Sequence, residues 1–398
     1  MISSKMTALA KNNSVIRAMF EEGNRLAAQL GRENVYDFSL GNPNFPPPDA
    51  VKNAIRAVLD DTEPVAVHGY MSNAGFPAVR ESVAAFLNKT HGTRFSAGNI
   101  IMSVGAAGGL NAVLKTLLNP GDEVAAFAPY FVEYGNYVGN YDGVLTVVPP
   151  NAPTFQPSPE ALAAALTPRT KAVILNSPNN PTGVVYSEAT LTALAEVLEA
   201  KQREYGAPIY IISDEPYREL AYDGVAVPYV TRLYRNTFVC YSWSKSLSLP
   251  GERIGYVAIP SEMDDFELIF DACSIATRVL GFVNAPSLLQ LAVARCLEEK
   301  TDLAGYDGNR RLLYDALTRL GFGCVYPQGA FYMWVQAPGG DDKSFAAAAK
   351  AHNILFVPGT SFACPGYVRI AYCVARGTIE RSLAGFARLA AEYGLEAK

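Results

Sequence analysis

From residue 99 to residue 258, short apolar runs alternate with helical segments, and this alternation constrains the fold more than any other feature. Runs such as NIIMSV, EVAAFAP, KAVILNSP and IYIISDE have the length and composition of buried strands. Segments such as AAGGLNAVLKTLL and EATLTALAEVLEAKQREY lie between them and have the composition of helices. This order is typical of a largely parallel sheet covered by helices on both faces. We therefore predict an α/β fold with a mostly parallel central sheet.

The two ends of the chain predict a second, smaller domain. A helix over residues 308–320 leads to CVYPQGAFYMWVQ, whose alternation predicts a strand pair with a Gln-Gly turn. The strand YVRIAYC and a final helix follow, an order typical of an α+β domain. Residues 14–30 have helical spacing, and the prolines of VYDFSLGNPNFPPP then predict an extended crossing segment. We predict a large domain over residues 49–295 and a small domain built from residues 1–48 and 296–398.

Composition excludes several classes of function. The chain is 49% hydrophobic and 18% charged, which predicts a compact globular protein. Its net charge of −5 gives no electrostatic basis for binding nucleic acid or an anionic membrane. We expect neither a signal peptide in MISSKMTALAKNNS nor a membrane span, because no run approaches roughly 18 apolar residues. Six scattered cysteines without a CxxC pair predict a reduced, cytoplasmic protein, and three histidines leave little material for a metal site or a Ser-His-Asp triad.

One lysine stands on an irregular connection between two predicted strands. The stretch YSWSKSLSLPGERIGY places Lys245 between Ser242 and Ser244, after the strand TFVCYSW and before the strand IGYVAIP. Loops held by a rigid scaffold are where chemistry tends to sit. With Glu252 as the one acid nearby, the amine of Lys245 is a candidate to form a Schiff base. Taken alone, the residue is more readily interpreted as a solvated surface lysine.

The wider pattern around this lysine resembles a known family. The pattern SxSKxxxxxGxRxG, the lysine-containing signature of class I aminotransferases, is matched by Ser242, Ser244, Lys245, Gly251, Arg253 and Gly255. Those enzymes are fold-type I proteins that depend on pyridoxal 5'-phosphate (PLP). The resemblance spans roughly residues 35–375. It implies that Lys245 holds the cofactor and that Ser242, Ser244 and Arg253 contact its phosphate, Arg253 as a charge-assisted donor.

Two further motifs follow predicted strands, where ligands gather in open α/β sheets. SVGAAGGLN is a helix start with small residues and free N–H groups, which suits a phosphate, although tight packing is the alternative. The resemblance implies that Ala106, Ala107 and Gly108 hold the cofactor phosphate there. In APYFVEY it implies that Phe131, or alternatively Tyr130, covers the face of the cofactor ring. An aromatic core residue is the other interpretation.

The next two motifs address the ring of the cofactor. NSPNNPTG is a turn signal that closely resembles the NPTG motif of the family, in which Asn180 donates to the phenolic oxygen. In SDEPYREL, Asp214 ends an apolar strand, and a buried carboxylate is costly unless it is paired. A protonated ring nitrogen would be that partner and would create the electron sink that PLP chemistry needs. Tyr217 would join Asn180 at the phenolic oxygen. The alternative is that Asp214 caps a helix turn and Tyr217 only packs.

The substrate side is predicted from a strand near the carboxy terminus. Arg369 is central in YVRIAYC, and an arginine buried between Val and Ile needs an anion. The α-carboxylate of an amino acid fits its planar fork. The resemblance places Gly41, Asn42 and Asn180 on the same side of the cleft. It also implies that Tyr70 reaches across a homodimer interface to the cofactor phosphate of the neighbouring subunit, unless this tyrosine packs there without touching a ligand.

The resemblance implies transamination by a ping-pong mechanism. An amino acid displaces Lys245, whose freed amine moves a proton between the substrate and the cofactor, and a 2-oxo acid leaves before a second one enters. HGYMSNAGFPAVRE looks like aspartate-type prokaryotic sequences, which favours a dicarboxylic substrate, whereas Tyr-rich surroundings tolerate an aromatic one. Arg278 stands six residues before Asn284, where one aspartate subgroup has an arginine five residues before an Asn-Pro. It is a candidate for the substrate side chain or a surface arginine.

Two other functions are compatible with this fold. A PLP-dependent lyase or decarboxylase would keep Lys245, Asp214 and Arg253, and it would release ammonia or carbon dioxide instead of completing half of a transamination. A regulatory protein would bind PLP without turnover. Such a protein usually carries a DNA-binding segment, for which we expect no room at the ends of this chain.

Overall fold

The centre of the molecule is a seven-stranded sheet with the order β2-β8-β7-β6-β5-β3-β4. The structure is a computed structural model that describes residues 2–11 and 15–396. The strands are β2 (Ile100–Ser103), β3 (Glu123–Phe127), β4 (Val144–Val148), β5 (Thr170–Asn176), β6 (Tyr210–Asp214), β7 (Thr237–Ser242) and β8 (Gly255–Ala258). Only β8 runs against its neighbours, β2 and β7, and the other pairs are parallel. The prediction of a mostly parallel sheet is confirmed.

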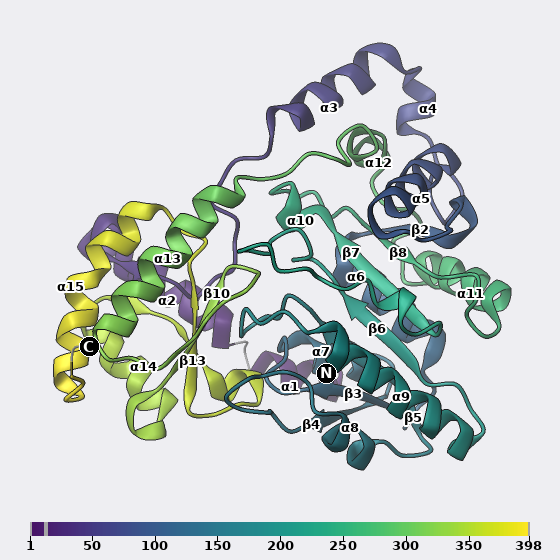
Figure 1. Ribbon diagram of the computed structural model, residues 1–398. Coiled ribbons are helices and arrows are strands. Elements are labelled where there is room, and N and C mark those ends of the chain that lie inside the picture. Colours follow the sequence, from purple (N-terminus) through teal and green to yellow (C-terminus); the bar gives the residue numbers. More distant parts are fainter. Residues whose placement is uncertain (1, 12–14, 397–398) are drawn as a thin grey trace.

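Helices cover both faces of this sheet, as the apolar runs of its strands require. Successive strand residues face opposite sides, so that Ala126 packs into one helical layer and Ala125 into the other. The first layer contains α6 (Gly105–Leu117), α7 (Glu133–Gly139) and α11 (Phe266–Val279). The second layer contains α8 (Pro159–Ala165) and α9 (Glu188–Tyr205). Figure 1 shows the sheet between these helices.

A third group of helices packs at the β2–β8 end of the sheet and forms a separate apolar cluster with it. These helices are α3 (Asp49–Asp61), α5 (Pro77–His91) and α12 (Ser287–Val293), with the short α4 (Pro64–His68) beside them. A one-turn helix, α10 (Trp243–Ser246), leaves the end of β7 and begins the connection to β8. Antiparallel neighbours need no crossover helix, so this connection is free to carry functional residues.

A second, smaller body lies beside the first (Figure 1). Its antiparallel sheet has the order β12-β13-β10-β9, formed by β9 (Cys324–Val325), β10 (Tyr332–Gln336), β12 (Val357–Pro358) and β13 (Tyr367–Ala371). One apolar cluster joins this sheet to α13 (Leu303–Arg319), α14 (Asp342–Ala351) and α15 (Arg376–Glu392). The strand pair predicted in CVYPQGAFYMWVQ is present as β9 and β10.

The amino-terminal segment reaches the smaller body through a short parallel pair, β1 (Tyr36–Asp37) with β11 (Ile354–Leu355). The chain begins with α1 (Ser4–Lys11) and α2 (Val15–Leu30), of which the second is the predicted leading helix. The domain bounds themselves stay a prediction. Within the described part of the chain, all six cysteines are free thiols and no helix has the length and apolarity to cross a bilayer.

Candidate active site

A cavity of about 260 Å³ lies where the strands of the central sheet end. The carboxyl ends of parallel strands meet at one edge of a sheet, and ligands of open α/β folds bind outside that edge. Strand β5 ends at Asn176, β6 at Asp214 and β7 at Ser242, and all three residues line the cavity. The smaller body closes the other side with Tyr332 and Arg369.

Lys245 lies in α10 with its amine inside this cavity. Its Nζ donates to the carbonyl oxygen of Gly41 at 2.8 Å and lies 5.3 Å from the centre of the Phe331 ring. Burial lowers the pKa of Lys245 to about 8, and the positive charges of Arg253 and Arg369 act in the same direction. The fold therefore supplies a lysine amine that is readily available in its neutral, nucleophilic form.

Asp214 is buried at the end of β6 with only one of its oxygens satisfied. Its Oδ2 accepts a hydrogen bond of 2.5 Å from the hydroxyl of Tyr134, whereas its Oδ1 has no partner among the described residues. Burial raises the pKa of Asp214 to about 7, although the hydrogen bond from Tyr134 lowers it. A cationic N–H donor inside the cavity would satisfy Oδ1 and favour the carboxylate form.

A site suited to an anion lies at the amino-terminal end of α6. The helix begins at Gly105, whose φ of 66° is a left-handed conformation. A Cβ at this position would lie 2.7 Å from Nη2 of Arg253, so the guanidinium group sits directly over the helix start. Ala106 and Ala107 follow at the cavity wall, and free N–H groups in the first helical turn attract negative charge.

Two serines complete this anion site. The hydroxyl groups of Ser242 and Ser244 lie 2.6 Å apart, and both residues line the cavity. The Ser242 side chain also caps α10 by accepting from the backbone N–H of Ser244 at 3.2 Å. The same hydroxyls thus fix the turn that carries the lysine and supply donors for an anion.

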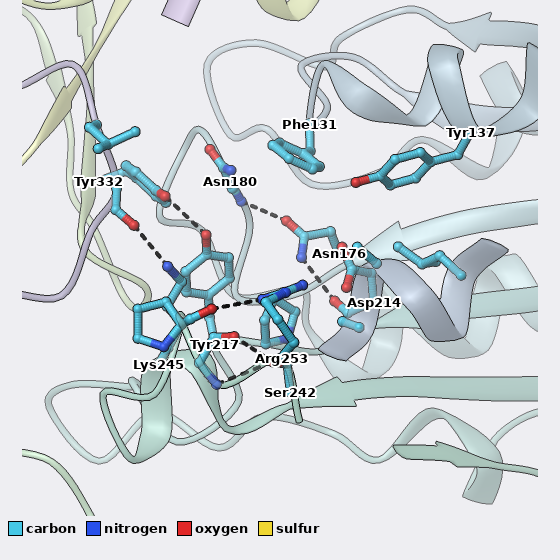
Figure 2. Close-up of a pocket in the computed structure, with 18 of the residues that line it drawn as sticks. Phe131, Tyr137, Asn176, Asn180, Asp214, Tyr217, Ser242, Lys245, Arg253 and Tyr332 are labelled. Atoms are coloured by element: carbon cyan, nitrogen blue, oxygen red, sulfur yellow. Dashed lines mark hydrogen bonds between the residues drawn. The ribbon is translucent and has the colours of Figure 1, made fainter. Parts of the chain in front are cut away.

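Aromatic residues define the remaining walls. Figure 2 shows Phe131 and Tyr137 across the cavity from Lys245 and Ser242. The hydroxyl of Tyr217 lies 2.9 Å from that of Tyr332. Burial is the main cause that raises the pKa of the Tyr217 phenol well above its usual value, so the group is neutral and can donate or accept.

Arg369 is held in place from several sides where the smaller body closes the cavity. Its Nη1 donates to Oδ1 of Asn180 at 3.0 Å and its Nη2 to the carbonyl oxygen of Ser39 at 2.5 Å. The guanidinium group lies 4.5 Å from the centre of the Tyr332 ring and 5.0 Å from that of Phe362. These contacts orient the fork but include no carboxylate, so the positive charge stays available for an anionic ligand.

Comparison with known proteins identifies the family. The family described as aminotransferase class I and II matches residues 33–386. The chain belongs to this aminotransferase family. The aspartate/prephenate aminotransferase of Thermus thermophilus is similar to this aminotransferase, with 33% identity over 377 residues that cover 92% of this chain and 94% of that enzyme.

Solved structures agree with this assignment. A crystal structure of an amino transferase from Eubacterium rectale matches the aminotransferase with a TM-score of 0.97 and 46% identity, and 99% of each chain is covered. The aspartate aminotransferase of Thermus thermophilus with maleate matches with a TM-score of 0.85 and 29% identity, over 98% of this chain and 99% of that one. The protein is accordingly a PLP-dependent transaminase.

The residues around the cavity fit PLP. The orphaned Oδ1 of Asp214 suits a protonated ring nitrogen, and the neutral amine of Lys245 suits an aldehyde. The start of α6 with Ser242, Ser244 and Arg253 suits the phosphate. Asn180 and Tyr217, the residues predicted to contact the phenolic oxygen, also line the cavity.

Five of the residues named in the predictions lie outside this cavity, and one of them is Tyr130, the alternative to the wall residue Phe131. Gly108 is buried, and its N–H donates to the carbonyl oxygen of Val104 at 3.3 Å, so it is occupied within the structure. Asn42 follows the wall residue Gly41 but does not line the cavity. Tyr70 is 93% exposed, and Arg278 is exposed near the end of α11. Their predicted roles stay predictions, and those of Tyr70 and Arg278 require a second subunit.

The structure also adds residues to the site that the sequence analysis did not single out. The cavity is further lined by Leu40, Leu110, Tyr137, Asn176, Pro216, Pro250 and Tyr332. Asn176 carried a usable signal, because like Asp214 it is a polar residue that ends an apolar strand. Its Oδ1 accepts from the backbone N–H of Asn180 at 2.7 Å, and its Nδ2 donates to the carbonyl oxygen of Asp214 at 2.9 Å. It thereby joins two of the predicted motifs (Figure 2).

Proposed function

We propose that this aminotransferase transfers the amino group of an L-amino acid to a 2-oxo acid by a ping-pong mechanism, with a preference for a dicarboxylic, aspartate-like substrate. The observation that carries the proposal is one cavity lined by a lysine with a lowered pKa, a carboxylate with an orphaned oxygen and an arginine free of carboxylate partners. The name of the aspartate/prephenate relative supports the dicarboxylic preference.

Each charged residue has a separate task in this proposal. When bound, PLP supplies an electrophilic carbon and an electron sink. Arg369 binds the α-carboxylate of the substrate, with Asn180 and Gly41 on the same side. Lys245 Nζ, in its neutral form, takes the proton from the α-carbon of the substrate. Asp214, whose pKa burial raises to about 7, would take its charged form against the protonated ring nitrogen, and Tyr217 provides a neutral hydroxyl in the same cavity.

An apolar or aromatic substrate is the second candidate. The cations that line the cavity in the described chain are Lys245, Arg253 and Arg369, and each already has a task in the proposal. A second carboxylate would therefore need a cation from elsewhere, such as Arg278 of another copy. Leu40, Phe131 and Tyr332 instead offer apolar and aromatic surface to a substrate side chain.

A panel of amino donors with 2-oxoglutarate tests both candidates, with Lys245→Ala as the blank. We expect aspartate to give the highest kcat/KM and the cofactor absorption to convert to the pyridoxamine form with donor alone. A higher value for phenylalanine or leucine would replace the dicarboxylic preference with the second candidate. Release of ammonia or carbon dioxide without that conversion would instead identify a lyase or decarboxylase.

We further propose a cytoplasmic homodimer with the active site at the interface. The free cysteines support the location, and the exposed Tyr70 supports a role for this residue in a neighbouring site. Mixing Lys245→Ala subunits with Tyr70→Ala subunits tests the arrangement. A hybrid dimer would contain one site with both residues intact, so activity should return on mixing. If the mixture is no more active than its components, Tyr70 acts within its own subunit or not at all.

A further inference from the structure

A second cavity, of about 580 Å³, lies behind the turn that carries Lys245. It shares no lining residue with the active-site cavity. The end of β7 and the helix α10 separate the two cavities. Ser242, Ser244 and Lys245 line the active-site cavity. Tyr241, Trp243 and Ser246 line the second cavity. A ligand in the second cavity would therefore touch the backbone segment that positions the catalytic lysine from its opposite side.

The chemistry of this cavity favours an organic ligand with an apolar body. Its wall includes Phe86 and Trp243 together with Val225, Leu297 and Leu303. Its volume is within the range of roughly 300–1,000 Å³ that small-molecule sites occupy. The rim carries an ion pair between Lys89 and Glu298, and both of these side chains are exposed to solvent.

One carboxylate in the lining, that of Glu219, has an oxygen without a partner in the described part of the chain. Oε2 of Glu219 is buried and has no hydrogen-bond partner among the described residues. The nearby cation, Arg218, is already occupied, since its Nε donates to Glu215 at 2.5 Å and its other two nitrogens to the carbonyl oxygens of Val227 and Pro228, each at 2.9 Å. Burial raises the pKa of Glu219, whereas the charge of Arg218 and hydrogen bonds from the Glu219 backbone and from Tyr241 lower it. A cationic donor placed against this carboxylate would supply the missing partner.

The cavity is also connected to the chain that leads into the smaller body. The N–H of Thr301 donates to the carbonyl oxygen of Ser246 at 2.8 Å, and its hydroxyl lies 2.9 Å from that of Ser248. Leu303, two residues later, begins α13 and lines the cavity. Figure 1 shows this segment crossing from α12 to α13. The lysine turn and the connection to the substrate-binding side therefore meet at one small-molecule-sized cavity.

We propose that this cavity binds a small organic ammonium ion, with the ammonium against Glu219 and an apolar body against Phe86, Trp243 and Leu297, and that its occupancy changes turnover at Lys245. The binding part of this inference does not depend on which substrates the enzyme uses. The site is distinct from the catalytic one. It acts through Trp243 and Ser246, the first and last residues of the short helix that carries Lys245.

The probe is N,N-dimethylphenethylamine, a tertiary amine that keeps one N–H donor when protonated and cannot form an imine with PLP. Its neutral comparator is N,N-dimethyl-2-phenylacetamide. Calorimetry on the holoenzyme, with saturating 2-oxoglutarate present to occupy the substrate end, should show one amine bound per chain. The amide should bind at least about tenfold more weakly, as expected for the loss of a charge-assisted hydrogen bond.

Two variants locate the site. Glu219→Gln, which keeps the shape of the side chain, should weaken amine binding about tenfold or more, whereas Glu298→Gln at the rim should leave it unchanged. Thermal unfolding of both variants checks that they are folded. Equal binding of amine and amide, unchanged binding by Glu219→Gln, or amine binding that appears only when 2-oxoglutarate is omitted would overturn the site.

The regulatory part has its own readout. Saturating amine should change kcat of the wild-type enzyme at least about twofold and should have no effect on Glu219→Gln. Binding without any change in kcat or KM would overturn the coupling to Lys245. If no amino donor supports turnover, the proposed function fails, but the calorimetric result still decides whether the cavity binds the amine.

Discussion

The two walls of the active-site cavity hold buried charge in different ways. On the wall formed by the central sheet, Asp214 keeps an orphaned oxygen, and the side-chain amine of Lys245 makes one hydrogen bond, to Gly41. On the wall formed by the smaller body, Arg369 is fixed by two hydrogen bonds and two aromatic rings. The first pair has unmet bonding capacity and pKa values near neutrality, whereas the arginine is oriented in advance.

This difference separates two kinds of catalytic contribution. Groups with shifted pKa values and missing hydrogen-bond partners act on reacting atoms, because a bound cofactor and substrate supply the partners that these groups lack. A rigid, permanently charged fork acts on binding and orientation. Substitutions on the sheet wall should therefore reduce kcat, and substitutions on the opposite wall should mainly raise KM.

The largest effect is expected for Lys245→Ala. In the proposed mechanism this amine both attaches the cofactor and acts as the base, so turnover should fall by about 10⁴-fold or more. After borohydride reduction, mass spectrometry should find the cofactor on the wild-type peptide that contains Lys245 and on no peptide of the variant. Lys343→Ala, at an exposed lysine, is the matched control and should remain active. An active variant that retains its cofactor through dialysis would refute the assignment of the lysine.

The next effect concerns the pH dependence of stability without cofactor. The folded pKa of Asp214 is raised from 3.8 to about 7, so its contribution is present below pH 4 and is lost as the pH rises through 7. The folded pKa of Lys245 is lowered from 10.5 to about 8, so its contribution is present above pH 10.5 and is lost as the pH falls through 8. Each is worth on the order of 3–4 kcal/mol over its window.

Denaturant unfolding of the cofactor-free protein at several pH values measures these windows. Asp214→Asn should flatten the fall between pH 4 and 7, and Lys245→Met should flatten the rise between pH 8 and 10.5. Each variant serves as the control for the window of the other. Profiles that both variants leave unchanged would show that the two groups titrate normally in the folded chain, and the contrast between the walls would then lose its electrostatic basis.

Arg369→Lys should affect binding more than chemistry. Lysine keeps the charge but loses the bidentate fork and the stacking on Tyr332, so KM for the amino donor should rise about 10- to 100-fold while kcat changes less. Steady-state kinetics with one donor and one 2-oxo acid measure the split. Arg376→Lys, at the exposed start of α15, is the control. A fall in kcat at unchanged KM would place Arg369 among the groups that act on the transition state and would remove the distinction between the walls.

How far the sequence predicts this site depends on the range of the contacts involved. Lys245, Asp214 and Asn180 each lie beside a predicted strand end within a recognisable motif, so chemistry and location could be inferred together. The alternation of apolar runs likewise predicted the sheet. Tyr332 was missed because its place in the site depends on a hydrogen bond with Tyr217, 115 residues away. Nothing local in YMWVQ distinguishes it from a core tyrosine. Tyr134 was missed for the same reason, since its partner Asp214 lies 80 residues further along the chain.

Tyr134 allows the most sensitive test of the difference between the two walls. It donates a hydrogen bond to Asp214 but does not itself line the cavity. Its hydrogen bond lowers the pKa of Asp214, so Tyr134→Phe should raise that pKa further and weaken the charge available to the cofactor ring. We expect kcat to fall by up to about tenfold with KM nearly unchanged, in line with the loss of one hydrogen bond to a charged group. The acidic limb of the kcat–pH profile should move to higher pH, a shift that a purely structural defect would not produce. Tyr141→Phe, which removes a half-buried hydroxyl that is hydrogen-bonded to Asn111 and not to Asp214, is the control. A Tyr134→Phe enzyme whose pH profile matches the wild type would mean that the cofactor alone keeps Asp214 charged. The hydrogen bond from Tyr134 would then have no effect on the protonation of Asp214.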